Sequence, residues 1–171
     1  LLVKRFDRDS GDARHMISGF TLMDVEETGD WGSYQDLALA ARRHGDEKAG
    51  EQLFRRMVFN AMCANGDDHP RNHAFFVHRN AVKLTPAYDI VPRAVLLSSP
   101  QLALGCGAEG RAATAENLLS RPEPFGLSPK QGQEILSEMR DVMESWKTHF
   151  MACGVARKDL DLLEKRVLRG F

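Results

Sequence analysis

A wide apolar stripe between residues 53 and 62 constrains how this chain can fold. Its side chains recur at the spacing of an α-helix and leave one broad face apolar: Leu53, Phe54, Met57, Val58, Ala61 and Met62. A helix with so wide an apolar face must be substantially buried, so other elements of the chain must cover it. We expect Asp46 to cap this helix and the helix to end near Ala64.

Capping signatures predict further helices on both sides of this one. Ser33 with Asp36 three residues later predicts a helix over 34–44 that ends at Gly45. Ser128, Pro129 and Gln131 provide an N-cap, a proline at the first helical position and a capping-box glutamine. The apolar face of that second helix continues to Gly154, through Ile135, Met139, Val142, Trp146 and Phe150. A last helix carries Leu160, Leu163, Val167 and Leu168.

Extended structure is predicted only in short segments. Two apolar runs, 74–77 and 82–84, flank Arg79 and Asn80 and predict a β-hairpin. Residues 1–6 predict a short strand, residues 94–104 are apolar enough to include one, and residues 105–110 predict a flexible loop. The predicted fold class is therefore mainly α, with a small β-hairpin inserted in the middle of the chain.

Length and composition restrict the class of protein. A chain of 171 residues suits one domain, and its net charge of −1 predicts no strong attraction to nucleic acid or to an anionic membrane. The sequence has no apolar run of about 20 residues, the length that crosses a membrane. Its three cysteines are widely spaced and lack the spacing of zinc ligands. We therefore expect free thiols and a cytoplasmic location.

The residues that carry chemistry are concentrated between positions 65 and 89. A loop directly after the buried helix contains two aspartates, a histidine, an arginine and an asparagine, and Asp89 follows the predicted hairpin. Phosphoryl transfer needs a carboxylate near the attacking hydroxyl and oxygen ligands for magnesium, all held rigidly. Asp67 precedes Asn72 by five positions, as the catalytic aspartate precedes the metal-binding asparagine in protein kinases. Asp89 then stands where kinases place the second metal ligand.

Other interpretations of this loop involve less chemistry. Asp68 is interpreted as a turn residue or a brace of the loop. His69 either contacts phosphate or only braces the loop by hydrogen bonds. His69 and His73 have the spacing of a zinc pair on a helix, but Pro70 and the polar loop argue against a helix there. A zinc hydrolase is therefore disfavoured.

Three segments together resemble the C-terminal region of the HipA-like serine/threonine-protein kinases. They are Arg56–Asn60, with the sequence RMVFN, Gly66–His73, with the sequence GDDHPRNH, and Leu84–Asp89, with the sequence LTPAYD. Weaker similarity extends over 3–8, 33–45 and 125–128. The resemblance implies a helical, kinase-like C-terminal lobe whose small β-hairpin carries the catalytic and metal-binding loops.

The resemblance also implies roles for individual residues. Asp67 would be the general base, while Asn72 and Asp89 would hold Mg²⁺ against the phosphates of ATP. The remaining ATP-binding residues would be Lys4, Arg5 and Phe6 in the hinge segment, His69 and Arg71 beside the phosphates, and Tyr88 next to Asp89.

The same resemblance divides the chain into a hinge strand over 1–6, a catalytic core over 46–92 and C-terminal helices over 112–171. No glycine-rich phosphate loop and no ATP-binding lysine strand precede the hairpin, so the N-terminal lobe is expected to be absent. We accordingly expect negligible kinase activity from this chain alone. Members of the family include toxins that phosphorylate aminoacyl-tRNA synthetases and are held by a DNA-binding, HipB-like antitoxin, which gives two candidate partners.

Two alternative functions stay open from the sequence. Aminoglycoside and choline kinases share a similar G-D-x-H-x-x-N loop, so a small-molecule phosphotransferase is one alternative. The other is a non-catalytic binding module derived from a kinase.

Overall fold

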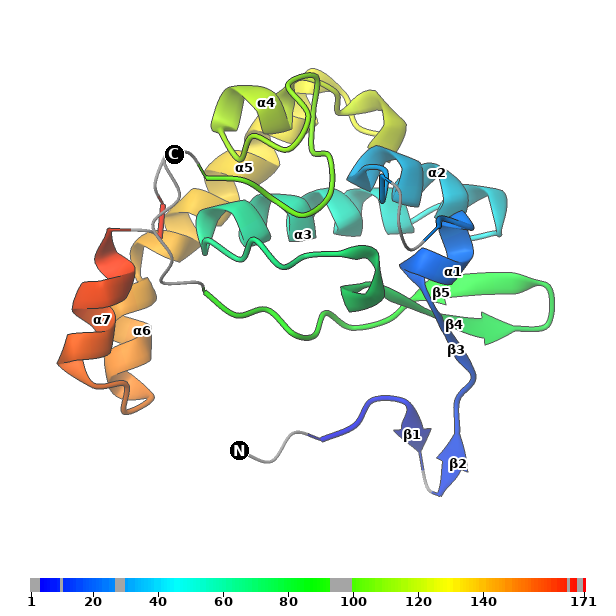
Figure 1. The fold of residues 1–171 in the computed structure, drawn as a ribbon, viewed down its shortest axis with the longest axis horizontal. Helices are drawn as coiled ribbons and strands as arrows, with labels where there is room; N and C mark the ends of the chain where they lie inside the picture. The colour runs from blue at the N-terminus through cyan, green and yellow to red at the C-terminus, as the bar shows by residue number, and fades with distance from the viewer. Residues whose placement is uncertain (1–3, 10, 27–29, 93–99, 166, 169–170) are drawn as a thin grey trace.

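The computed structural model describes residues 4–9, 11–26, 30–92, 100–165, 167–168 and 171. These residues form seven α-helices, two short 3-10 helices and two small antiparallel sheets. The long helix α3 (Ala49–Met62) runs through the centre of the molecule, between α2, α5 and the larger sheet (Figure 1). None of the helices in the described part of the chain is both long and apolar enough to cross a membrane.

The predicted apolar stripe of α3 forms the centre of the hydrophobic core. Leu53, Phe54, Met57 and Val58 are fully buried. The start of α3 differs from the prediction, because Asp46 does not cap it. Its carboxylate instead accepts the backbone N–H of Leu84 at 2.7 Å, and α3 begins after Lys48 without a side-chain cap. Asp46 therefore fixes the end of a strand rather than the start of a helix.

The capping box at Ser33 is confirmed. Helix α2 (Tyr34–Arg43) starts with the Ser33 hydroxyl accepting the N–H of Asp36, while the Asp36 carboxylate accepts the N–H of Ser33. Its inner face packs on α3, which buries Tyr34, Leu37 and Ala41 completely.

The predicted hairpin is also confirmed, as β4 (Ala74–His78) and β5 (Ala81–Leu84) paired antiparallel with Phe75 opposite Leu84. A third strand, β3 (Met16–Ser18), pairs with the other side of β4 and was not predicted. The short helix α1 (Gly19–Met23) follows it at once, with Ser18 as its N-cap.

The predicted strand over 1–6 is wrong where the structure describes it, because residues 4–6 belong to no strand. Residues 1–3 lie outside the described part. Two two-residue strands follow instead, β1 (Arg8–Asp9) and β2 (Asp12–Ala13), paired antiparallel. This N-terminal segment passes below the larger sheet in Figure 1.

The segment after residue 100 contains turns rather than a strand. Positions 94–99 of the predicted strand lie outside the described residues. Among residues 100–104, only Gln101 forms a β-bridge, an isolated one with Ala112. The loop 105–110 is packed on α4 (Ala115–Leu119), where the buried Asn117 amide donates to the carbonyls of Gly110 and Ala112. A Cβ at Gly107 would lie 1.9 Å from the Asn117 carbonyl oxygen, so this loop needs glycine there.

The C-terminal third is helical but interrupted. Helix α5 (Pro129–Glu144) has the predicted capping box of Ser128 and Gln131. It ends at Ser145, and α6 (Trp146–Ala152) follows as a separate helix, so the continuous face expected to run to Gly154 is wrong. Helix α7 (Arg157–Glu164) packs on α6. Beyond it, Leu168 donates its N–H to the carbonyl of Met62 at 2.7 Å, which ties the tail to the end of α3.

Candidate active site

In the loop that follows α3, two asparagine side chains bond the backbone of Asp67, one at its carbonyl and one at its N–H. The Asn72 side-chain amide donates to the carbonyl of Asp67 at 2.9 Å, and the side-chain oxygen of Asn65 accepts the N–H of Asp67 at 3.3 Å. Asn72 ends the 3-10 helix η1 (Pro70–Asn72), which turns the chain back toward Asp67. Asp67 and Asn72, five residues apart in the sequence, are thus in direct contact. The side-chain nitrogen of Asn72 makes this contact within the loop.

A buried polar chain supports this loop from the core. Asn65 donates to the side-chain oxygen of Asn60 at 3.1 Å, and Asn60 donates to the hydroxyl of Tyr34 at 2.8 Å. All three side chains are almost fully buried. Buried polar groups joined in this way specify one arrangement of the backbone, because any other would leave some of them without a partner.

Asp68 braces the loop, as one of its two interpretations proposed. It is almost fully buried, and its carboxylate accepts the N–H of Ala103 at 2.6 Å. Burial raises the pKa of Asp68, while the nearby Tyr34 hydroxyl acts in the opposite direction. The contact connects the loop after α3 to a segment more than thirty residues away in the sequence.

His73 packs in the core beside the loop. Its ring meets Tyr34 edge-on at 5.2 Å, and its Nε2 lies 3.3 Å from the carbonyl of Asp68. Burial and the charge of Arg56 lower the pKa of His73 to about 3, so the ring is neutral at physiological pH. Within the described residues, no group of three His, Cys, Asp or Glu side chains is placed to hold a metal ion.

The loop after β5 brings Asp89 to the same place as Asn72. Both residues line one small cavity, together with Tyr88. The Tyr88 hydroxyl donates to the carbonyl of Arg71 at 2.6 Å and so connects this loop to η1. Asp89 adopts a left-handed backbone conformation with φ of 55°, which is uncommon for a residue with a side chain. Side-chain oxygens of Asn72 and Asp89 are the kind of ligand that magnesium takes.

His69 and Arg71 each contact an aromatic ring beside this loop. The ring of His69 meets Trp31 edge-on at 5.9 Å, and the guanidinium of Arg71 lies 4.2 Å from the ring centre of Phe20.

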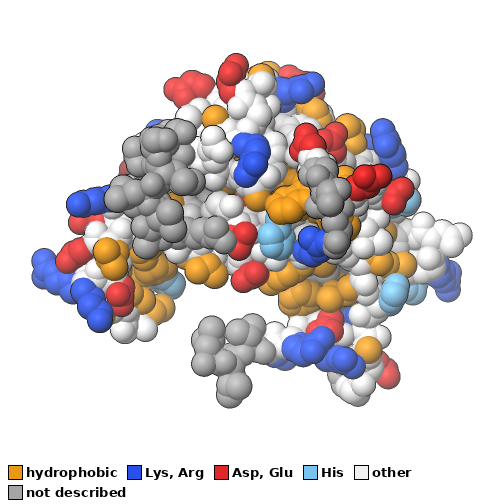
Figure 2. All heavy atoms as spheres, viewed as in Figure 1, with side chains coloured by type: hydrophobic (Ala, Val, Ile, Leu, Met, Phe, Trp, Pro, Cys, Tyr) orange, Lys and Arg blue, Asp and Glu red, His pale blue; other side chains and the backbone are white. Residues whose placement is uncertain are grey.

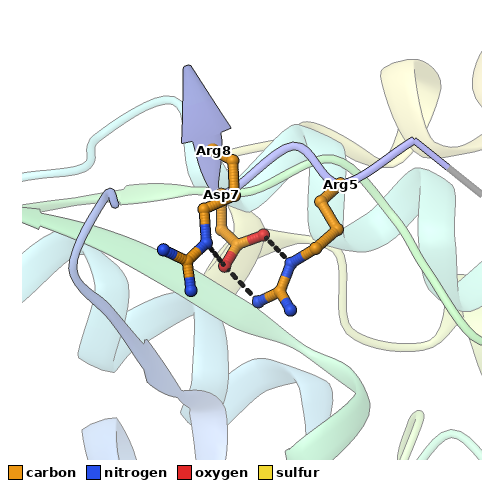
Figure 3. Close-up of polar contacts among 3 residues, drawn as sticks. All are labelled: Arg5, Asp7 and Arg8. Carbon is orange, nitrogen blue, oxygen red and sulfur yellow. Dashed lines mark hydrogen bonds and ion pairs between the residues drawn. The ribbon is translucent and has the colours of Figure 1, made fainter. Parts of the chain in front are cut away.

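Of the three predicted hinge residues, Phe6 is the one that contacts the rest of the site. Its ring lies 6.0 Å from that of Phe76 and 5.9 Å from that of Tyr88. The guanidinium of Arg5 instead forms two hydrogen bonds with the carboxylate of Asp7 (Figure 3). These bonds hold the pKa of Asp7 below its usual value. Lys4 is exposed.

The candidate residues lie along an open face rather than in a deep pocket. Figure 2 shows acidic, basic and histidine side chains gathered at the centre of one face, above the N-terminal segment. A larger cleft of about 710 Å³, lined by Arg14, Phe76 and Lys83 among others, lies against the loop after β5. Among the described residues, none of the predicted ATP-binding side chains lines that larger cleft.

The sequence did not predict the buried polar residues that support the site from the core. Tyr34, Asn65 and His73 are buried and polar, and Asn60 lies on the apolar stripe of α3. The position of Asn60 was a usable signal, because a polar side chain on a buried helical face needs a specific partner. Tyr34 and Asn65 gave no comparable signal, since their contacts depend on how α2 meets α3.

Comparison with known proteins gives a consistent result. The model of the HipA-like C-terminal domain family matches residues 1–146. A serine/threonine-protein kinase toxin HipA of Shewanella oneidensis is 28% identical over 89 residues, which are 52% of this chain and 18% of that protein. A putative kinase of Haemophilus influenzae is 34% identical over 92 residues, or 49% of this chain and 27% of that protein. The chain therefore matches less than a third of the length of either relative.

A solved structure has the same fold. It is the complex of HipA, HipB and operator DNA from the Shewanella oneidensis MR-1 toxin–antitoxin system, and its matching chain superposes with a TM-score of 0.70 at 17% identity. The match covers 95% of this chain and 45% of that chain.

Proposed function

Because the chain belongs to the family of HipA-like C-terminal domains, we propose that it is the C-terminal lobe of a serine/threonine-protein kinase. The reaction is transfer of the γ-phosphate of ATP to a protein hydroxyl. One observation carries the proposal: Asn72 contacts Asp67 directly and lines the same cavity as Asp89. A base and two metal ligands in this arrangement are what kinase chemistry requires.

In this proposal Asp67 acts as the base. Its half-buried carboxylate orients the acceptor hydroxyl and takes its proton, while Asn65 and Asn72 keep its backbone in place. Asn72 and Asp89 would bind Mg²⁺ through their side-chain oxygens. The ion would offset the negative charge that the phosphate oxygens carry during transfer.

The other predicted residues surround the nucleotide in this proposal. Arg71, already placed against the ring of Phe20, and His69 lie beside the phosphates. Phe6 and Tyr88, whose rings are in contact, offer an aromatic surface next to the adenine, with Lys4 and Arg5 in the same segment. The open face of the site agrees with a need for a second lobe to cover the nucleotide.

Partners of the full-length protein follow by analogy. The structural neighbour was solved with HipB and operator DNA, so we propose a HipB-like antitoxin as a partner. The protein substrate, an aminoacyl-tRNA synthetase in the toxins that the sequence resembles, stays a proposal of the same kind. We also propose a cytoplasmic location, with which the three free thiols agree.

Two substitutions in the full-length protein test this function. Asp67→Asn should lower kcat by at least about 100-fold and leave Mg²⁺-dependent ATP binding intact, because only the base is lost. Asp89→Ala should abolish that binding, because a metal ligand is lost. Phosphorylation of protein and aminoglycoside acceptors and calorimetric titration with ATP measure the two effects.

Asp141→Asn is the matched control, since Asp141 is exposed on α5. It should change neither kcat nor binding. Unchanged kcat in Asp67→Asn, or retained Mg²⁺-dependent binding in Asp89→Ala, would refute the assignment. Faster transfer to aminoglycosides than to proteins would favour the small-molecule alternative.

A further inference from the structure

The small cavity behind Asn72 and Asp89 has features of a built polar site. It is lined by side chains from α3, the catalytic loop and the loop after β5, including Arg56, Asn60, Asp68 and His73. The space within it that the centre of a water molecule can occupy is about 10 Å³. That volume suits one water molecule and excludes phosphate or a nucleotide.

Three residues that line the cavity each carry a buried polar atom without a partner among the described residues. They are Nη1 of Arg56, Oδ2 of Asp68 and Nδ1 of His73. A second polar atom of each side chain does have a partner. Nη2 of Arg56 donates to the carbonyl of Thr85, and Oδ1 of Asp68 accepts the N–H of Ala103. Nε2 of His73 bonds the carbonyl of Asp68. Buried polar atoms of this kind cost free energy unless a shared partner bonds them.

The hydrogen-bonding capacities of the three atoms are complementary to one water molecule. Nη1 of Arg56 can only donate, and Oδ2 of the Asp68 carboxyl group can accept. The carbonyl of Asp68 can only accept, so Nε2 of His73 carries the proton that it donates there, and in that tautomer Nδ1 is an acceptor. A water molecule donates twice and accepts up to twice, so it can bond all three atoms.

We infer that this cavity binds one ordered water molecule that joins Arg56, Asp68 and His73, and that Arg56 is a positioning residue for the Asp89 loop. Through its other nitrogen, Arg56 holds the carbonyl of Thr85, at the start of the loop that ends in Asp89. The water would therefore connect this loop to the catalytic loop through α3. The part of the inference that concerns Mg²⁺ rests on the proposed function, whereas the water site does not.

A high-resolution crystal structure of the 171-residue chain tests the water site directly. The expected result is a single density peak within hydrogen-bonding distance of all three atoms, which disappears in Arg56→Met. An empty or collapsed cavity in the unsubstituted chain would overturn the inference. A peak that persists unchanged in Arg56→Met would overturn the part assigned to Arg56.

Titration of the full-length protein with Mg²⁺ at fixed ATP tests the positioning role. Arg56→Met should raise the Mg²⁺ concentration for half-saturation about tenfold, in line with loss of a charge-assisted hydrogen bond. Arg56→Lys, which keeps the charge but cannot bond both partners, should shift it in the same direction by less. It also serves as the second variant if Arg56→Met does not fold.

Two control variants separate positioning from stability. Arg55→Met removes the neighbouring arginine of α3, whose partners are Glu51 and Glu138, and should leave the Mg²⁺ requirement unchanged. Leu53→Ala weakens the buried face of α3 and should also leave it unchanged. Equal shifts in Leu53→Ala and Arg56→Met would reduce Arg56 to a structural role. If the unsubstituted protein binds no ATP with Mg²⁺, the proposed function fails and the crystallographic result still decides the water site.

Discussion

Burial alone separates the three cysteines into two chemical classes. Cys63 and Cys106 are buried in the core, and Cys153 is exposed after α6. Burial raises the pKa of Cys63 to about 11 and that of Cys106 to about 12. Since the thiolate is the reactive form, the two buried thiols are unreactive both because they are inaccessible and because they stay protonated.

Thiol labelling of the folded chain should therefore stop at one group. At about pH 8, a disulfide reagent should react rapidly with Cys153 only, and with all three thiols once a denaturant is added. The release of thiolate from the reagent measures both numbers. Cys153→Ser should abolish the rapid phase, and rapid reaction of a second thiol in the folded chain would show that the core opens.

The residues of the candidate site differ in how visible they were in the sequence. Asp67, Asn72 and Asp89 were predicted because kinase-like spacing constrains residues close together in the chain. The structure brings Asn72 to both of the others, while their chemical roles stay predictions. The buried Tyr34 could not be predicted as a support, because its contact with Asn60 spans 26 residues and exists only once α2 packs on α3.

At the scale of elements, local sequence signals predicted the starts of helices correctly. A strand stabilised by pairing with a distant segment was missed. The capping boxes at Ser33 and Ser128 are confirmed because both partners lie within four residues. The predicted long helix is wrong at Ser145, whose hydroxyl donates to the carbonyl of Val142 and competes with helical continuation. Strand β3 was missed because three residues show no periodicity, and its stability comes from pairing with β4.

The capping box of α5 gives a prediction for this scale. Ser128→Ala removes the hydroxyl that accepts the N–H of Gln131, so the free energy of unfolding should fall by about 1 kcal/mol. Chemical denaturation measures the change. Ser137→Ala, at an exposed position within the same helix, should change it by less than about 0.5 kcal/mol. Equal effects of the two substitutions would contradict a capping role.

At the scale of the whole molecule, the C-terminal tail contacts the end of α3, where the loop of the candidate site begins. Leu168 donates its N–H to the carbonyl of Met62, the last residue of α3, and Val167 is buried beside it. Carbonyls at the end of a helix lack partners within the helix, so the tail supplies one of them. Helix α3, the C-terminal helices and the candidate site are thus mechanically connected.

Removal of residues 165–171 should accordingly loosen the end of α3. The buried Val167 side chain and the hydrogen bond of Leu168 are lost, and the free energy of unfolding should fall by about 2 kcal/mol. Hydrogen exchange at Ala61, Met62 and Cys63 should quicken more than at Leu53. As a control, Leu162→Ser replaces an exposed side chain of α7 and should have little effect. Unchanged exchange at the end of α3 would show that the tail contact is unimportant.

The left-handed conformation of Asp89 has a consequence for how such chains evolve. A residue with a side chain pays about 1 kcal/mol or more to remain in that conformation, and glycine would not. If Asp89 binds the metal as proposed, selection for its carboxylate opposes the gain in stability that glycine would bring. A lineage that no longer needed the carboxylate would become more stable by losing it, so glycine at this position would mark descendants that have abandoned the ancestral chemistry.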